Sequence, residues 1–198
     1  MEKIYETAYA KINLGLDVLG KRSDGYHEVR MVMQSVGLSD AVEIEEGEGL
    51  VVETDHSGLA GGPDNLAWKA AELLARCCGK IPNVHIRLNK KIFLAAGLAG
   101  GSSDAAAVMR GLSRLWQLDL TAPELEKLAA ELGSDIPFCI TGGTALAEGR
   151  GEILTELPEA PELLLVLAKP KLEVATGWVY GNFRQQKVNQ RPDIDGII

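Results

Sequence analysis

The sequence predicts an α+β fold, because strand patterns and helix patterns occupy different parts of the chain. Near the N-terminus, apolar and polar residues alternate as they do in strands that bury one face. Further along, apolar residues recur every three or four positions, which is typical of amphipathic helices. With 198 residues, 46% of them hydrophobic, the chain is long enough for one large domain, or for one domain and part of another.

The first predicted strand runs from Ala8 to Val18, where every second side chain is apolar. Its polar face carries Lys11 and Asn13, and Gly15 leaves room beside them. A hairpin turn is expected at Asp24-Gly25. More strands are expected at 27–36, 41–44 and 50–54, so that this segment forms an antiparallel meander.

Two helices and one strand are expected in the middle of the chain. The first helix is capped by Asp64 and ends at Gly79. A strand with one polar face follows at 84–88. The other helix begins with the capping box Thr121-Ala-Pro-Glu124 and ends at Gly133, where Ser-Asp-Ile-Pro starts a further element.

The last part of the chain is expected to begin after a loop that contains prolines, over 157–161. The continuous apolar run at 163–168 is typical of a buried strand. Thr176 is expected to cap a short helix that carries Trp178 and Tyr180. The final residues, 193–198, resemble the opening turn of another helix.

The stretch IFLAAGLAGGSSDAAAVMRGLSRLW, residues 92–116, joins a predicted short buried strand to a predicted helix. Its glycines precede Ser102, Ser103 and Asp104, which stand where the helix begins and can cap free N–H groups. Such a junction points N–H donors and the positive end of the helix dipole at one place, which favours a phosphate. The spacing excludes both G-x-x-x-x-G-K-[ST] and G-x-G-x-x-G. A tight turn without a ligand remains the alternative.

Composition excludes several classes of partner. A formal net charge of −8 argues against nucleic acid and against anionic membranes. No apolar run approaches the ~20 residues of a membrane span, and Glu2 and Glu6 interrupt any signal peptide. Three cysteines, two of them adjacent, form neither a disulfide framework nor a metal motif. We therefore expect a cytoplasmic protein.

Four stretches resemble one superfamily of kinases. AAGLAGGSSDAAA resembles the phosphate loop of the GHMP kinases, named for galactokinase, homoserine kinase, mevalonate kinase and phosphomevalonate kinase. AYAKINLGLDVLGKRSDGYHEV, LGSDIPFCITGGTALAEGRGE and KPKLEVATGWVY are similar to the branch that acts on 4-diphosphocytidyl-2-C-methyl-D-erythritol in the non-mevalonate isoprenoid pathway. The likeness extends to about Tyr180. One departure is Phe93, where the family usually has proline, and it is expected to alter the strand exit but not the donors.

The resemblance implies two α+β domains with the site in the cleft between them. A GHMP-kinase-like N-terminal domain, of the ribosomal protein S5 domain 2-like fold, is expected over 1–155, and an incomplete second domain over 156–198. Family members continue past this point and carry a third glycine-rich motif that nothing after Gly151 resembles. We therefore expect a truncated form that binds ATP weakly, phosphorylates poorly or not at all, and associates through an uncovered apolar face.

The resemblance also implies ATP-dependent phosphorylation of a hydroxyl group, with Asp135 as the base and Lys11 polarising that hydroxyl. The residues that would hold the ATP phosphates are Leu94, Ala95, Ala96, Gly97, Leu98, Ala99, Gly100, Gly101, Ser102 and Ser103. Mg²⁺ would bridge the phosphates, with Ser102 or Ser103 as a candidate ligand. The cytidine diphosphate substrate would be bound by Asn13, Tyr26, His27 and Tyr180, with the two tyrosines on opposite faces of the cytosine ring.

Each of these residues also has a purely structural interpretation. Lys11 could be a solvent-exposed residue of a strand, and Asp135 could be a carboxylate at a helix start. The aromatic residues could contribute to ordinary packing. Two other functions also remain open: another GHMP-type small-molecule kinase, or a nucleotide-binding fragment without turnover. The Gly-Tyr-His triplet at 25–27, together with Tyr180, argues against the first, because homoserine and mevalonate have no ring to stack. The presence of both Lys11 and Asp135 argues against the second. The sequence predicts no oligomeric state.

Overall fold

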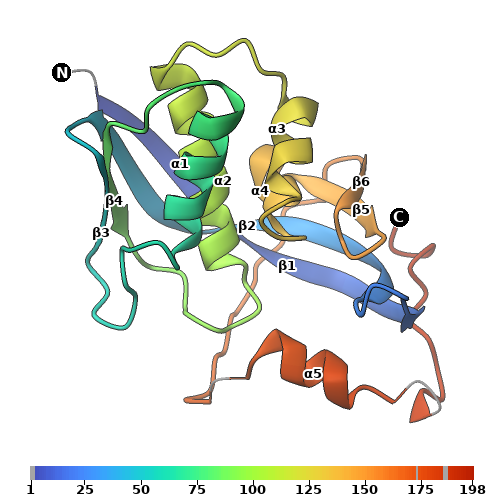
Figure 1. Cartoon of the computed structure of the whole chain (residues 1–198). Coiled ribbons are helices and arrows are strands. Elements are labelled where there is room, and N and C mark those ends of the chain that lie inside the picture. The colour runs from blue at the N-terminus through green and yellow to red at the C-terminus, as the bar shows by residue number, and fades with distance from the viewer. Residues whose placement is uncertain (1–2, 173, 185–186) are drawn as a thin grey trace.

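The computed structural model describes residues 3–172, 174–184 and 187–198, so Glu173 of the KPKLEVATGWVY stretch lies outside the described residues. A six-stranded sheet has the order β3-β4-β2-β5-β6, with β1 also paired to β2, and α1, α2 and α4 contact its strands (Figure 1). The elements are β1 (Lys3–Lys21), β2 (His27–Glu46), β3 (Leu50–Thr54), α1 (Leu66–Cys77), β4 (Val84–Asn89), α2 (Gly100–Leu115), α3 (Ala122–Ala129), α4 (Ile136–Thr141), β5 (Thr144–Glu148), β6 (Ile153–Glu156) and α5 (Thr176–Asn182). The α+β class is confirmed.

The hairpin of β1 and β2 is the longest feature of the sheet. The expected turn at Asp24-Gly25 is confirmed: Gly25 has φ +90°, and the N–H of Arg22 donates to the carbonyl of Tyr26. β2 is one continuous strand of 20 residues, although two strands were expected there. Its length lets it pair with β4 near one end and with β5 nearer the other.

The antiparallel meander expected for the N-terminal segment is wrong at residues 50–54, which form β3. β3 pairs in parallel with β4, from Leu50 beside Val84 to Thr54 beside Leu88, while β4 pairs with β2. α1 lies between β3 and β4 in the chain and forms the crossover that two parallel strands require. Alternation of apolar residues shows that a segment is a strand but not which neighbour it joins.

Helix ends follow local hydrogen bonding. Asn65, not Asp64, caps α1, because its side chain accepts a hydrogen bond from the N–H of Ala67. Gly79, just beyond the helix, has φ +63°, as expected of a stop signal. The capping box of Thr121 and Glu124 is confirmed in α3.

The core lies between the sheet and its helices. α1 and α2 pack through small side chains, including Ala70, Ala71 and Ala106, which are fully buried. A smaller cluster, with Phe138 of α4 and Met33 of β2, lies at the other end of β2. No helix in the described parts of the chain is long and apolar enough to cross a membrane.

The chain after β6 departs most from expectation. Residues 157–172 form no helix or strand, and Leu164 and Val166 are 98% and 96% exposed, so the buried strand expected at 163–168 is wrong. Thr176 is the first residue of α5 and not its cap, which is Ala175. The last residues form no α-helix but pack on the hairpin: Arg191 pairs with Asp17, and Arg30 with Asp195. The division into domains at 155 stays a prediction.

Candidate active site

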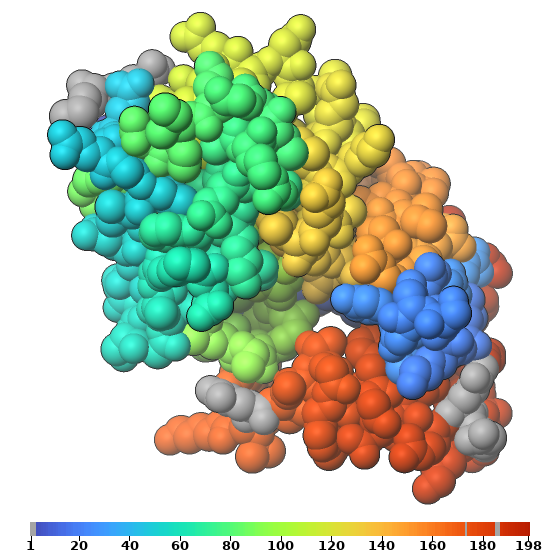
Figure 2. Space-filling model, in the orientation of Figure 1, coloured from blue at the N-terminus to red at the C-terminus, as the bar shows by residue number. Residues whose placement is uncertain are grey.

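A cleft of about 1320 Å³ lies between the β1–β2 hairpin, the segment from 93 to 102 and α5. We call that segment the glycine loop. The orange-red C-terminal segment that contains α5 forms a separate layer against the rest of the molecule (Figure 2). The cleft brings together most of the residues expected to bind ligands. Its lining includes Lys11, Asn13, Tyr26, His27, Ala95, Ala96, Gly97, Leu98, Ser102, Asp135 and Tyr180.

The glycine loop presents free main-chain donors. Within the described chain, no group accepts a hydrogen bond from any main-chain N–H between Phe93 and Ser102. Ala95, Gly97 and Ala99 have φ of +51°, +70° and +58°, whereas the residues between them do not have positive φ. Alternating signs of φ turn successive N–H groups toward one side and form a concave site for an anion. An alanine with positive φ is strained, which is typical of functional loops.

The start of α2 differs from the expected arrangement. The short strand expected at the beginning of the stretch is absent, and the helix begins at Gly100 behind Ala99, with no side chain as cap. Ser102 borders the cleft, but the buried Ser103 donates its hydroxyl hydrogen to the carbonyl of Tyr9, 2.6 Å away. Asp104 is buried against Lys90, and burial raises its pKa to about 7. Of these three side chains, Ser102 is therefore the one available to a ligand.

Lys11 and Asp135 meet inside the cleft. The Lys11 Nζ lies 3.6 Å from Asp135 Oδ2 and donates to Asn13 Oδ1 at 3.3 Å. The lysine side chain is only 6% exposed, so it is not the solvated strand residue of the structural interpretation. Asp135 precedes α4 but caps no N–H group, and its side chain is 36% exposed. An ammonium group and a partly solvated carboxylate thus share one wall.

The backbone fixes the Lys11–Asp135 pair next to the glycine loop. The N–H of Lys11 donates to the carbonyl of Leu98 at 3.1 Å, so β1 and the loop are joined directly. The pairing of β1 with β2 shifts register between Tyr9 and Lys11, which turns the strand locally. The guanidinium group of Arg110 donates to the carbonyl of Cys139 at 2.6 Å, which ties α4 to α2.

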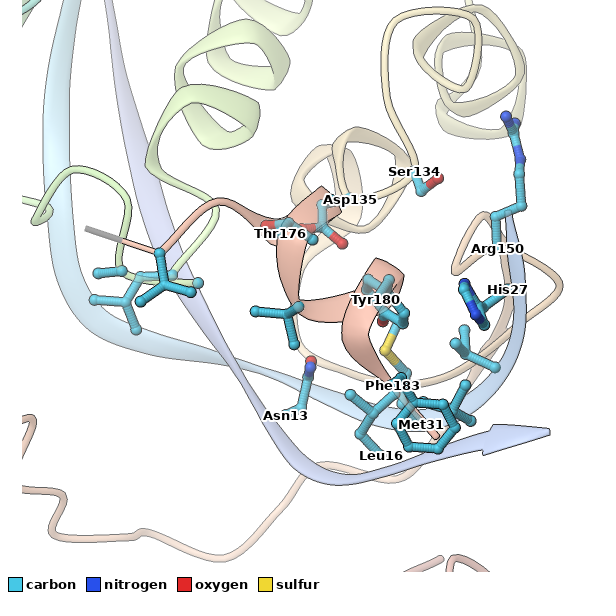
Figure 3. Close-up of a pocket in the computed structure, with 18 of the residues that line it drawn as sticks. Asn13, Leu16, His27, Met31, Ser134, Asp135, Arg150, Thr176, Tyr180 and Phe183 are labelled. Atoms are coloured by element: carbon cyan, nitrogen blue, oxygen red, sulfur yellow. The ribbon is translucent and has the colours of Figure 1, made fainter. Parts of the chain in front are cut away.

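The aromatic residues lie in a different arrangement from the expected clamp. Tyr180 stacks on His27, with ring centroids 5.2 Å apart, and Phe183 meets the same histidine edge-on (Figure 3). Tyr26 is 53% exposed, and the guanidinium of Arg150 lies 4.8 Å from its ring centroid. Burial, with a smaller effect of Asp135, raises the pKa of the Tyr180 hydroxyl. The ring of Tyr180 faces His27 in this structure, so the two-tyrosine sandwich stays a prediction.

The sequence did not single out Phe183 and Arg150, which also line the cleft. Phe183 follows Tyr180 by three positions, which is the spacing of one helical face. Arg150 lies between two glycines with positive φ, in the turn from β5 to β6. Within the described residues, no group of three or more His, Cys, Asp and Glu side chains could hold a metal ion.

Comparisons with known proteins identify a family of kinases. The family model described as GHMP kinases N terminal domain matches residues 65–143. A 4-diphosphocytidyl-2-C-methyl-D-erythritol kinase from Acetivibrio thermocellus is 48% identical over 100% of this chain and 70% of that protein. The protein of the same name from Synechococcus sp. is 51% identical over 93% of this chain and 60% of its own length.

Solved structures give the same result. A crystal structure of 4-(cytidine 5'-diphospho)-2C-methyl-D-erythritol kinase superposes with a TM-score of 0.78 and 35% identity, over 98% of this chain and 69% of that one. A mevalonate kinase superposes with a TM-score of 0.60 at 15% identity, over 78% of this chain and 56% of that one, and this likeness concerns the fold alone.

Proposed function

The chain belongs to the 4-diphosphocytidyl-2-C-methyl-D-erythritol kinase family of the GHMP kinases, and from this membership we propose that it phosphorylates a hydroxyl of that substrate with ATP. The observation that carries the proposal is the Lys11–Asp135 pair, 3.6 Å apart, beside a loop whose N–H groups have no acceptor among the described residues. The pair supplies a cation and a carboxylate where a hydroxyl would react.

The glycine loop is the proposed site of the ATP phosphates. Its unpaired N–H groups and the N-terminus of α2 offer several donors to the same anion. Mg²⁺ would neutralise charge on the phosphates, and the donor set fits this role, because Ser102 borders the cleft and the phosphates supply the other oxygens. The Ser103 hydroxyl, by contrast, is bound to Tyr9.

Asp135 and Lys11 would act on the acceptor hydroxyl. Asp135 would orient the hydroxyl and accept its proton, since its carboxylate is neither a helix cap nor fully buried. Lys11 would stabilise the negative charge that develops on the transferring group. Because the lysine is almost fully buried, its charge is poorly screened by water.

The other wall of the cleft is the proposed cytidine site. Asn13, Tyr26, His27 and Tyr180 all border it, and they combine aromatic faces with hydrogen-bonding groups. The net charge of −8 supports small-molecule partners over nucleic acid or membranes, and we place the protein in the cytoplasm.

A turnover assay with labelled ATP and a panel of acceptors tests the proposal. We expect slow transfer of label to the cytidine substrate and none to homoserine or mevalonate. Transfer to one of the other acceptors would indicate another GHMP-type kinase. Binding of ATP and the cytidine substrate in a calorimeter without any transfer would indicate a nucleotide-binding protein instead.

A further inference from the structure

A buried ionic cluster lies behind the glycine loop, outside the cleft lining. It consists of Lys90, which directly follows β4, Asp40 of β2 and Asp104 of α2. We call it the Lys90 cluster. The Lys90 Nζ contacts a carboxylate oxygen of each aspartate. The three side chains are 1%, 0% and 2% exposed.

The cluster joins the two ends of the glycine loop. On the entry side, Asp40 Oδ1 accepts hydrogen bonds from the N–H groups of Lys91 and Ile92, at 2.5 and 2.8 Å. On the exit side, Asp104 belongs to the beginning of α2. Lys90 bridges both carboxylates, so the residues on either side of the loop are held at a fixed separation.

The start of α2 also packs closely on this cluster. A Cβ atom on Gly100 would come within 3.0 Å of Ile92 and 3.7 Å of the Lys90 Nζ. Both the entry segment and the cluster therefore touch the first residue of the helix. A side chain at this position would press on Ile92 and require it to shift.

Stability alone is a poor explanation for such a cluster. Removing three charged groups from water costs free energy, and apolar residues of similar volume often stabilise a folded protein equally well or better. Asp104 Oδ1 has no hydrogen-bond partner within the described structure, so the cluster is not even fully satisfied. A rigid bridge would, however, stabilise the conformation of the loop. Residues with strained backbone angles, such as Ala95 and Ala99, persist only where the surrounding structure holds them.

We propose that Lys90, bridging Asp40 and Asp104, is a positioning residue that holds the glycine loop in its phosphate-binding shape. The proposal rests on the function proposed above. Lys90 itself would not touch the phosphate: its ammonium group is buried and occupied by two carboxylates. Its effect on ATP binding would be exerted through the main chain of the loop.

The first test needs no ligand. The double variant Lys90→Met/Asp104→Asn removes the bridge and leaves Asp40 with its two main-chain donors. Lys91→Met, at the exposed neighbouring lysine, is the matched control. By hydrogen exchange, we expect faster exchange of the N–H groups of Lys11 and Ser103 in the double variant, because they donate to the loop carbonyls of Leu98 and Ala99, with β4 and α1 unchanged. Unchanged exchange of these two groups, or faster exchange throughout the molecule, would overturn the proposal.

The second test compares the two ligands. We expect the Kd for ATP to rise about tenfold or more in the double variant, the size usual for a misplaced binding group, and the Kd for the cytidine substrate to stay within about twofold. Equal losses for both ligands would contradict a role confined to the loop. Asp104→Asn alone, nearly identical in shape, should give a smaller loss of the same kind and serves if the double variant does not fold. If the unaltered chain binds no ATP, the proposed function fails, while the exchange experiment still decides the positioning role.

Discussion

At the scale of single residues, the proposed chemistry depends on one buried lysine and one partly exposed carboxylate. Lys11 would be an unusual residue to bury without a purpose, since lysines are rarely fully buried unless paired. Its neighbours are oxygen atoms of Asn13 and Asp135, and its own N–H group binds the glycine loop. The same residue thus connects the proposed phosphate site with the proposed acceptor site.

Replacement of the proposed base should abolish most turnover. Asp135→Asn is expected to lower kcat by about a hundredfold or more with little change in substrate affinity, the size usual for lost general-base assistance. Asp119→Asn, at an exposed carboxylate away from the cleft lining, is the control. Steady-state kinetics would refute the assignment if Asp135→Asn kept a near-normal kcat.

The aromatic residues should affect one ligand only. Tyr26→Ala or Tyr180→Ala is expected to weaken binding of the cytidine substrate by ~1–3 kcal/mol, the range for base–aromatic stacking, and to leave ATP affinity unchanged. Titration calorimetry with each ligand separates these effects. If both affinities fell together, the aromatic wall would be structural instead.

The thiol of Cys139 should react slowly in the folded protein. Burial raises its pKa to about 11, with a smaller contribution from Asp135, so the thiol stays protonated at any pH well below that value. Iodoacetamide at pH 8 is expected to label Cys77, which is exposed, much faster than Cys139, which is only partly exposed, and to label both at similar rates after unfolding. Peptide mass spectrometry gives the answer, and rapid labelling of Cys139 in the native state would be inconsistent with this burial.

At the scale of elements, α2 determines the position of the site. Its N-terminus meets the glycine loop, its middle contacts the sheet, and Arg110 binds the end of α4. Close approach to the sheet is possible because a glycine faces Ile44: a Cβ atom on Gly111 would lie 2.5 Å from Ile44 Cδ1. The helix is therefore seated on β2 at that point.

A larger side chain at that contact should push the helix away. Gly111→Val is expected to lower the free energy of unfolding by ~1–3 kcal/mol, as overpacking of a close-packed core usually does. Gly181→Val, where an added Cβ would have no neighbour within 4 Å, should leave stability nearly unchanged. Urea unfolding measures both, and an unaltered midpoint for Gly111→Val would show that the helix can move at little cost.

At the scale of the whole molecule, the chain has a well-packed body and an unpacked segment. The sheet and α1–α4 bury two clusters of apolar side chains, whereas residues 157–172 form neither helix nor strand and run outside both clusters. Leu164 and Val166 of this segment point almost wholly into solvent. Neighbouring exposed apolar side chains of this kind favour association between molecules.

Charged substitutions in this segment should therefore reduce self-association. Leu164→Asp/Val166→Asp is expected to lower the weight-average mass seen by light scattering at high concentration, without changing ATP affinity. Ile81→Asp, at a 76% exposed residue elsewhere, is the control. A monodisperse monomer in the unaltered chain would remove the basis of this prediction.

The sequence by itself determined the features that depend on neighbours in the chain. The Asp24-Gly25 turn, the capping box at Thr121 and the Gly79 stop were all predictable, because a few adjacent residues settle their backbone angles and hydrogen bonds. The resemblance of four stretches to GHMP kinases also placed Lys11 and Asp135 in one site, where the structure finds them.

Only the tertiary structure decided which distant groups meet. The parallel pairing of β3 with β4, the stacking of Tyr180 on His27 and the bridge from Lys90 to Asp40 and Asp104 all join segments far apart in the chain. Their partners are selected by the shape and burial of the whole core, and no local pattern carries that information. For the same reason, Ser103 looked like a phosphate ligand in the sequence, but its hydroxyl is bound to the carbonyl of Tyr9 in the fold.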